Sequence, residues 1–101
     1  MDKQSCEKLR MQIADVIDKY KLNKVILFGS RARGDNNEKS DYDFFIDAPY
    51  LKSLLKFGLM VRDMKKVLQS DVDIILFPDE YTKIKPYLLD AIRKDGVTIY
   101  G

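Results

Sequence analysis

The sequence contains no histidine and only one cysteine, and these two shortages exclude several kinds of site. Without histidine there can be no histidine general base, no Ser-His-Asp triad and no zinc site built from histidine and cysteine. With Cys6 alone, no disulfide can form within the chain, which excludes a disulfide-stabilised secreted scaffold and favours a reducing, cytoplasmic location. A bound hard cation would therefore depend on carboxylates for its ligands.

Long apolar runs and charge of a single sign are also missing from the chain. No apolar run approaches the roughly 18 residues that a membrane span needs, and the polar N-terminus has no signal core, so we expect a soluble, unprocessed protein. The 18 basic and 16 acidic side chains are interspersed, and the net charge of +2 does not indicate direct nucleic-acid binding or an anionic-membrane partner. The length of 101 residues predicts a single domain, 1–101.

Hydrophobic periodicity predicts elements in the order helix-strand-strand-helix-strand-helix-strand. Helices are expected over 5–20, 49–69 and from 81 to the Asp95-Gly96 turn, with a restart or kink at Pro86; strands are expected over 24–28, 41–47, 72–77 and 97–100. Ser5 should cap the first helix, and Pro49 should occupy the first position of the second. This order implies an α/β (α+β) fold in which helices flank a small mixed β-sheet.

The apolar residues of these elements indicate which faces are buried. The strand over 24–28 is apolar on both sides and should lie inside the sheet, while the strand over 41–47 should bury Phe44 and Ile46 on one face. The apolar stripe expected on the second helix consists of Leu54, Phe57, Val61, Met64 and Leu68. We expect such stripes, and the six tyrosines, to serve the core rather than a partner surface.

A glycine turn follows the first predicted strand. Gly29 allows close approach of the backbone to a phosphate, and Ser30 supplies a hydroxyl and a backbone N–H at the start of a short helical turn. Arg31 and Arg33 add cationic side chains nearby. Considered alone, this turn is more simply explained as a strand end followed by solvated arginines.

Two well-known phosphate and cation motifs do not fit the same region. A P-loop requires Lys and Ser or Thr after its second glycine, but Asp35 follows Gly34 here. A calcium loop starting at Asp35 would need glycine and glutamate where the sequence has Ser40 and Ile46. The acidic residues that follow the turn therefore need another explanation.

Three aspartates have the spacing of a metal-dependent site. Asp41 and Asp43 are two residues apart and should share one face of a strand, where a divalent ion such as magnesium would relieve their mutual repulsion. Asp73 interrupts an apolar strand, where an unpaired charge is costly, and could be the third acid of a two-metal phosphoryl-transfer site. Asp71 should be a solvated residue at the strand end. Alone, the acids could instead protect an exposed sheet edge, but their combination with the glycine turn disfavours that explanation.

The combined motifs resemble the signature of the DNA polymerase β-type nucleotidyltransferases. They are Gly-Ser-Arg-Ala-Arg-Gly at 29–34, Ser-Asp-Tyr-Asp at 40–43 and Val-Asp-Ile-Ile at 72–75. Over essentially the whole chain, the sequence is more closely similar to the minimal nucleotidyltransferases, antitoxin-like proteins that are paired with HEPN-domain partners. The resemblance implies a mixed-sheet core that binds ATP and magnesium and moves a nucleoside monophosphate onto an acceptor hydroxyl.

The resemblance also implies a role for each motif residue. Gly29 and Ser30 would hold the β- and γ-phosphates of ATP. Asp41 and Asp43 would ligate both metal ions, and Asp73 would hold the metal ion that activates the nucleophile. The two arginines of the turn, at 31 and 33, would either neutralise phosphate or face solvent.

The acceptor is the least defined part of this prediction. In the minimal subfamily it is a tyrosine hydroxyl of a HEPN-type toxin ribonuclease, which AMP transfer neutralises, and the absence of an appended domain also points to a partner protein. One alternative is a non-catalytic antitoxin that masks its partner. Another is a nucleotidyltransferase that acts on a small molecule or an RNA end, which the chain's size and modest charge disfavour.

Overall fold

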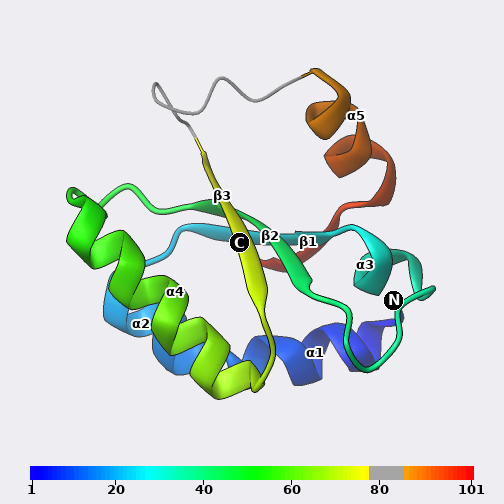
Figure 1. Cartoon of the computed structure of the whole chain (residues 1–101), viewed down its shortest axis with the longest axis horizontal. Helices are drawn as coiled ribbons and strands as arrows, with labels where there is room; N and C mark the ends of the chain where they lie inside the picture. The colour runs from blue at the N-terminus through cyan, green and yellow to red at the C-terminus, as the bar shows by residue number, and fades with distance from the viewer. Residues whose placement is uncertain (78–85) are drawn as a thin grey trace.

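A computed structural model, in which residues 1–77 and 86–101 are described, shows a four-stranded sheet with helices on both faces (Figure 1). The elements are α1 (Lys3–Gln12), α2 (Ala14–Tyr20), β1 (Lys24–Phe28), α3 (Ser30–Arg33), β2 (Tyr42–Asp47), α4 (Leu54–Leu68), β3 (Val72–Phe77), α5 (Pro86–Asp95) and β4 (Val97–Tyr100). The strand order is β3-β2-β1-β4, with β2 and β3 parallel and the other neighbouring pairs antiparallel. The predicted mixed sheet flanked by helices is confirmed. Within the described ranges, no helix is both long and apolar enough to cross a membrane.

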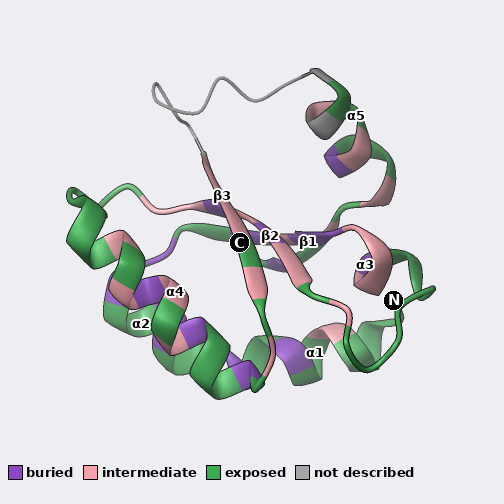
Figure 2. Cartoon of the chain, in the orientation of Figure 1, coloured by how far each residue is buried: buried purple, intermediate pink, exposed green. Residues whose placement is uncertain are grey.

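The core lies between the sheet and the layer formed by α1, α2 and α4 (Figure 2). As predicted, β1 is internal, and its Val25 and Leu27 pair with Ile46 and Phe44 of β2. All four side chains are fully buried, because alternate residues of each strand point to the same face. The predicted alternation of β2 is therefore confirmed.

The predicted first helix is two helices rather than one. α1 and α2 meet at Ile13, whose backbone leaves helical geometry and whose side chain is fully buried. The predicted cap at Ser5 was wrong: Asp2 caps α1, and its carboxylate accepts a hydrogen bond of 2.7 Å from the backbone N–H of Ser5. Asp2 takes this role because an N-cap side chain satisfies N–H groups two or three residues further on.

The second predicted helix starts later than expected. Pro49 lies in a turn closed by a hydrogen bond from Leu51 N–H to the Ala48 carbonyl, and α4 begins after Ser53, whose hydroxyl accepts from Lys56 N–H. The predicted apolar stripe was also partly wrong. Leu54 is 86% exposed, while the helix buries the three side chains Met60, Met64 and Leu68.

The last helix agrees with the sequence where it is described. α5 begins at Pro86, and the backbone N–H of Gly96 closes it on the Ile92 carbonyl at 2.8 Å; whether a helix precedes Pro86 lies outside the described residues. Tyr81 and Ile84, the first apolar positions of the predicted helix, lie outside the described residues. The expectation that the tyrosines serve the core is confirmed for Tyr20 and Tyr42 and was wrong for Tyr50, Tyr87 and Tyr100, which are exposed.

A charged cluster joins α2 to α4 on the layer below the sheet. Asp63 accepts hydrogen bonds from the Tyr20 hydroxyl at 2.6 Å and the Lys19 ammonium at 2.9 Å, and the Arg62 guanidinium donates to its other oxygen at 3.2 Å. The Tyr20 hydrogen bond, followed by that of Lys19, lowers the pKa of Asp63 well below its usual range. The cluster is therefore a source of acid-sensitive stability.

We expect Asp63→Asn to lower the free energy of unfolding near neutral pH by about 1 kcal/mol, because it weakens a charge-assisted hydrogen bond to Tyr20. A lowered folded-state pKa stabilises the fold above the unfolded pKa of about 3.9, and this stability is lost as the pH falls through the folded pKa. The difference between wild type and variant should therefore shrink below about pH 4 in urea titrations. A difference that stays constant across the acid range would contradict this assignment.

Candidate functional site

The turn after β1 brings glycine against a carboxylate. Gly29 has φ 77° and ψ −158°, a backbone conformation that is essentially restricted to glycine. A Cβ at this position would overlap the side-chain carboxylate of Asp43. The side chain that lies against Gly29 in the structure is therefore Asp43, and the predicted approach of a phosphate stays a prediction. Ser30 follows as the first residue of α3 and is half-buried.

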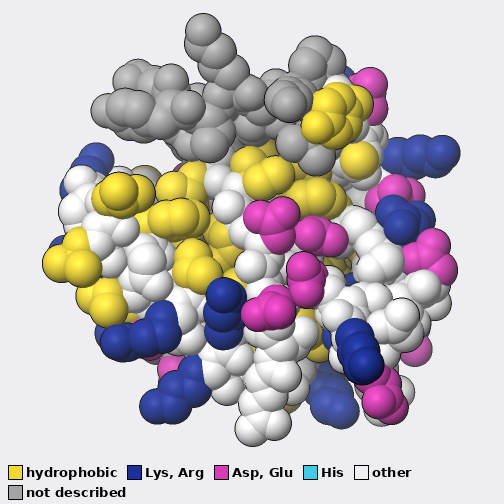
Figure 3. Space-filling model, in the orientation of Figure 1, with side chains coloured by type: hydrophobic (Ala, Val, Ile, Leu, Met, Phe, Trp, Pro, Cys, Tyr) yellow, Lys and Arg dark blue, Asp and Glu magenta, His cyan; other side chains and the backbone are white. Residues whose placement is uncertain are grey.

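Strand pairing collects the three predicted aspartates at one end of the sheet. Asp43 lies opposite Phe28 on one side and opposite Asp73 on the other, because β2 pairs with both β1 and β3. Asp41 lies just before β2 and is exposed, as is Asp73, whereas Asp43 is half-buried. Figure 3 shows acidic side chains gathered over β2 and β3 on this face of the molecule.

The electrostatics of Asp43 show how close these groups are. Burial raises the pKa of Asp43 above its ordinary value, and repulsion from Asp73 and then Asp41 raises it further, while Arg33 acts in the opposite direction. A carboxylate with a raised pKa is one whose charge the surroundings fail to neutralise. A cation placed among the three groups would remove this repulsion.

The reason given for Asp73 from the sequence was wrong, although its position was predicted correctly. β3 is an edge strand and Asp73 is exposed, so its charge remains in water and carries no burial cost. Asp71 is 78% exposed and lies 3.9 Å from the Lys65 ammonium, in agreement with a solvated residue at the strand end. The exposure of Asp73 leaves it accessible from outside the molecule.

The donor chemistry of this cluster fits a hard divalent cation. Three carboxylates at one end of a sheet are oxygen ligands of the kind that magnesium prefers. As the side chains stand in the described ranges, no group of three or more Asp, Glu, His or Cys is arranged to hold a metal ion. Ligation by Asp41, Asp43 and Asp73 would therefore require rotation of their side chains toward a common point.

Arg31 is held against the loop that leads into β2. Its Nε donates to the Ser40 carbonyl at 2.9 Å, and its guanidinium carbon lies 4.0 Å from the ring centroid of Tyr42. The Tyr42 ring in turn stacks on Phe44, with 5.9 Å between the centroids. Arg31 therefore connects α3 to the residues on both sides of Asp41. No feature of the sequence pattern indicated this contact.

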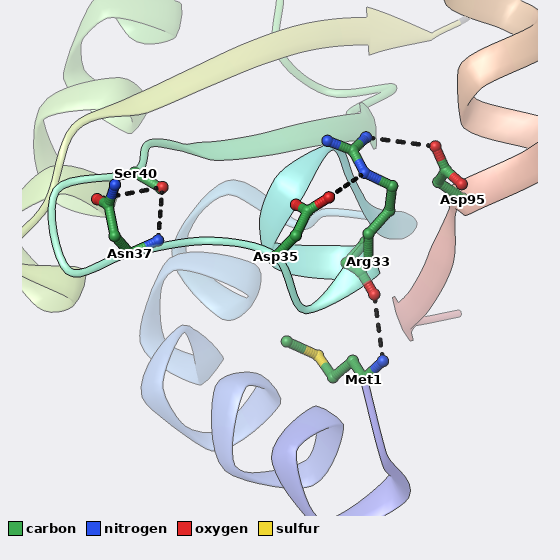
Figure 4. Close-up of polar contacts among 7 residues, drawn as sticks. Met1, Arg33, Asp35, Asn37, Ser40 and Asp95 are labelled. Atoms are coloured by element: carbon green, nitrogen blue, oxygen red, sulfur yellow. Dashed lines mark hydrogen bonds and ion pairs between the residues drawn. The ribbon is translucent and has the colours of Figure 1, made fainter.

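Arg33 lies at the surface between two acids (Figure 4). Its Nε donates to the Asp35 carboxylate at 3.0 Å, and its Nη1 donates to the Asp95 carboxylate at 3.4 Å. The second bond connects α3 to the end of α5. Its side chain is 45% exposed, so it remains available to solvent or to an anion. The sequence analysis missed Asp95 because the pair is separated by 62 positions along the chain.

The loop between α3 and β2 is ordered by its own polar side chains (Figure 4). Asn37 N–H donates to the Ser40 hydroxyl at 3.0 Å, and Ser40 N–H donates to the Asn37 carbonyl at 3.2 Å. The N-terminal ammonium of Met1 donates to the Ala32 carbonyl at 3.1 Å. These bonds hold the loop that positions Asp41.

Known proteins resemble this chain in sequence and in fold. Residues 11–101 match the family model described as polymerase beta, nucleotidyltransferase. The chain belongs to this nucleotidyltransferase family. Two candidate protein adenylyltransferases of Methanocaldococcus jannaschii are similar to it: one is 29% identical over 90% of this chain and 94% of its own length, and the other is 32% identical over 92% of each.

Solved structures show the same nucleotidyltransferase fold. One described as a minimal nucleotidyltransferase superimposes with a TM-score of 0.70 at 23% identity, covering 96% of this chain and 95% of that one. The Shewanella oneidensis complex of an MNT antitoxin with a tri-AMPylated HEPN toxin gives a TM-score of 0.67 at 18% identity, covering 95% and 72%. The predicted nucleotidyltransferase fold is thus confirmed.

The contacts of Arg31 predict a positioning role in nucleotidyl transfer. We expect Arg31→Ala to lower kcat about tenfold with little change in the KM for ATP, because misplacement of the loop before Asp41 disturbs alignment more than binding. Arg31→Lys should restore part of kcat, since an ammonium can still lie over Tyr42. Steady-state kinetics test this, and a rise in KM at unchanged kcat would instead indicate a phosphate contact.

Proposed function

We propose that this nucleotidyltransferase moves AMP from ATP to a hydroxyl group of a partner protein. The observation that carries the proposal is the convergence of the Gly29 turn on Asp43, with Asp41 and Asp73 at the same end of the sheet. The names of the relatives from Methanocaldococcus jannaschii, which describe protein adenylyltransferases, support a protein acceptor. The single cysteine and the use of ATP are consistent with a cytoplasmic reaction.

The acidic residues would hold two magnesium ions. Asp41 and Asp43 would be ligands of both ions, and Asp73 would be a ligand of one. Bound magnesium supplies positive charge to the phosphates and favours the ionised form of the acceptor hydroxyl. Asp73 lies on an exposed edge strand, so a hydroxyl carried by a large protein can approach it. This accessibility is the structural argument for a macromolecular acceptor.

The turn residues would bind the terminal phosphates. Gly29 brings the backbone close to the Asp43 carboxylate, and Ser30, the next residue, offers a hydroxyl and a backbone N–H at the start of α3. Arg33 is exposed and electrostatically coupled to Asp43, so it would neutralise phosphate charge, while Arg31 keeps the loop in place. In the reaction the acceptor oxygen bonds to the α-phosphorus, the bond to pyrophosphate breaks, and the acceptor proton passes to solvent.

We further propose that the partner is a HEPN-domain protein. This follows from the resemblance to the minimal subfamily, and one solved structure with the same fold pairs an MNT antitoxin with an AMPylated HEPN toxin. The second candidate function is a non-catalytic antitoxin that masks such a protein. Transfer to a small molecule or an RNA end is a weaker alternative, because the net charge is only +2.

Incubation with α-labelled ATP, magnesium and the purified product of the neighbouring gene tests this function. We expect label on that protein and release of pyrophosphate, and both should disappear in the double variant Asp41→Asn plus Asp43→Asn. Asp71→Asn is the matched control, because Asp71 is an exposed acid at the same strand end. Absence of both transfer and ATP binding would refute the enzymatic proposal. Full protection of cells by the double variant would favour masking.

A further inference from the structure

A cavity of about 480 Å³ lies at the end of the sheet opposite the carboxylates. It is formed by the end of α2, the loop after β2 and the beginning of α4, with Leu51 and Leu59 among its walls. Lys24 and Asp47 pair at this end of the sheet, whereas Asp43 lies four residues away, or about 13 Å along the strand. The cavity is therefore separate from the proposed nucleotide site.

The walls of this cavity carry positive charge. Of the seven described residues that line it, three are lysines and none is acidic. Lys19 is already paired with Asp63 at 2.9 Å. The Lys21 ammonium lies over the Tyr50 ring, 5.6 Å from its centroid, and Lys56 occupies the first turn of α4, where the helix dipole adds positive potential. Lys21 and Lys56 take part in none of the ion pairs among the described residues, so acidic groups of an occupant could pair with them.

Exposed apolar side chains adjoin the cavity-lining residues along the chain and are called the leucine rim. Leu54 is 86% exposed, Leu55 is 74% exposed and Tyr50, which lines the cavity, is 64% exposed. Neighbouring exposed leucines and tyrosines of this kind typically mark contact surfaces for other proteins. Figure 3 shows hydrophobic side chains on the same face of the molecule as the acidic cluster.

We propose that this lysine-lined cavity and its leucine rim dock an acidic, apolar segment of the acceptor protein. Carboxylates of that segment contact Lys21 and Lys56, an apolar side chain enters between Leu51 and Leu59, and further apolar side chains cover the rim. A standard protein interface covers about 800 Å² of each partner. The sheet end beside the cavity lies about 13 Å from Asp43 along β2, so one protein can occupy the cavity and still reach the carboxylates. The inference rests on the proposed function only for the identity of the protein that supplies the segment.

The probe for this surface is a synthetic 15-residue amphipathic helical peptide, built from Glu and Leu and titrated into the 15N-labelled protein. We expect a Kd of about 1 mM or tighter, with NMR shift changes confined to residues around Lys21, Tyr50 and Lys56. A peptide of the same length and leucine pattern with Lys in place of Glu should not bind. Equal binding of both peptides, shifts elsewhere or no binding would overturn the proposal.

Matched variants separate the cavity from general surface charge. The double variant Lys21→Glu plus Lys56→Glu should bind the acidic peptide at least tenfold more weakly than the wild type. The double variant Lys3→Glu plus Lys8→Glu makes the same charge change on exposed residues of α1 and should have little effect on this affinity. Leu55→Gln is a second test that leaves the core untouched, because this side chain is exposed, and it should also weaken binding.

The same variants distinguish a failure of docking from a failure of the proposed function. If the cavity binds the peptide but the neighbouring protein is not labelled, docking stands and the function is refuted. If the neighbouring protein is labelled equally by wild type and by the Lys21→Glu plus Lys56→Glu variant, the function stands and the docking proposal is refuted.

Discussion

Asp43→Asn should reduce nucleotidyl transfer by about a thousandfold or more and leave the fold intact. Asp43 is the carboxylate against which the Gly29 turn packs, and it lies between Asp41 and Asp73 in the proposed metal site. Loss of a shared ligand removes several kcal/mol of electrostatic stabilisation of the transition state, and about 1.4 kcal/mol corresponds to a tenfold change in rate. The measurement is the rate of AMP transfer at saturating ATP and magnesium.

The stability of the Asp43→Asn variant provides an internal control. Burial and repulsion raise the pKa of Asp43, so its charge opposes folding, and the wild type loses stability as the pH rises from the unfolded pKa through the folded pKa. The variant lacks this loss, and its free energy of unfolding at neutral pH should equal or exceed that of the wild type. Lower stability together with lower activity would show that Asp43 is a structural residue instead.

Gly29→Ala should damage both stability and activity. Its backbone conformation is one that alanine rarely adopts, at a cost of about 1–3 kcal/mol, and the new Cβ would displace the Asp43 carboxylate. We expect a lower urea midpoint and a loss of transfer of about a hundredfold, since small misplacements of reacting groups have effects of this size. Activity near that of the wild type would contradict the close contact between Gly29 and Asp43.

Two other glycines separate backbone strain from contact with the site. Gly34 has φ 86° and open space around its Cβ position, so Gly34→Ala should cost about 1 kcal/mol of stability with less effect on transfer. Gly58 lies inside α4 with no atom within 4 Å of that position, and Gly58→Ala should stabilise the protein by about 0.5–1 kcal/mol. Only Gly29→Ala should combine strain with a large loss of activity.

The sequence predicted the strands better than the helix boundaries. Alternation at Phe44 and Ile46 and the uninterrupted apolar run of β1 are local patterns, and both correctly indicated the buried faces. Helix limits depend on caps, and Asp2 and Ser53 compete with other polar residues that have the same local chemistry. Which of these residues caps a helix depends on where packing against the core makes the helix begin, and the local sequence does not show this. Ser5 and Pro49 were therefore assigned incorrectly.

The orientation of α4 shows a second limit of periodicity. Leu54 belongs to the apolar stripe by spacing, yet the first turn of α4 extends beyond the core and leaves this side chain exposed. Periodicity specifies which residues share a face of a helix, but it does not specify how far along the helix that face is covered. The proposed docking surface arises from this difference.

The sequence alone determined which residues make up the proposed site: Gly29-Ser30, the Asp41 and Asp43 pair and Asp73 are residue types and spacings that can be read along the chain. The parallel pairing of β2 with β3 decided that Asp73 lies beside Asp43, and the edge position of β3 decided that it is exposed. The tertiary structure also placed Arg31 on Ser40 and gathered the lysines around a cavity. Such contacts join residues that are distant in sequence, and their formation depends on the packing of the whole sheet and its helices rather than on any local pattern.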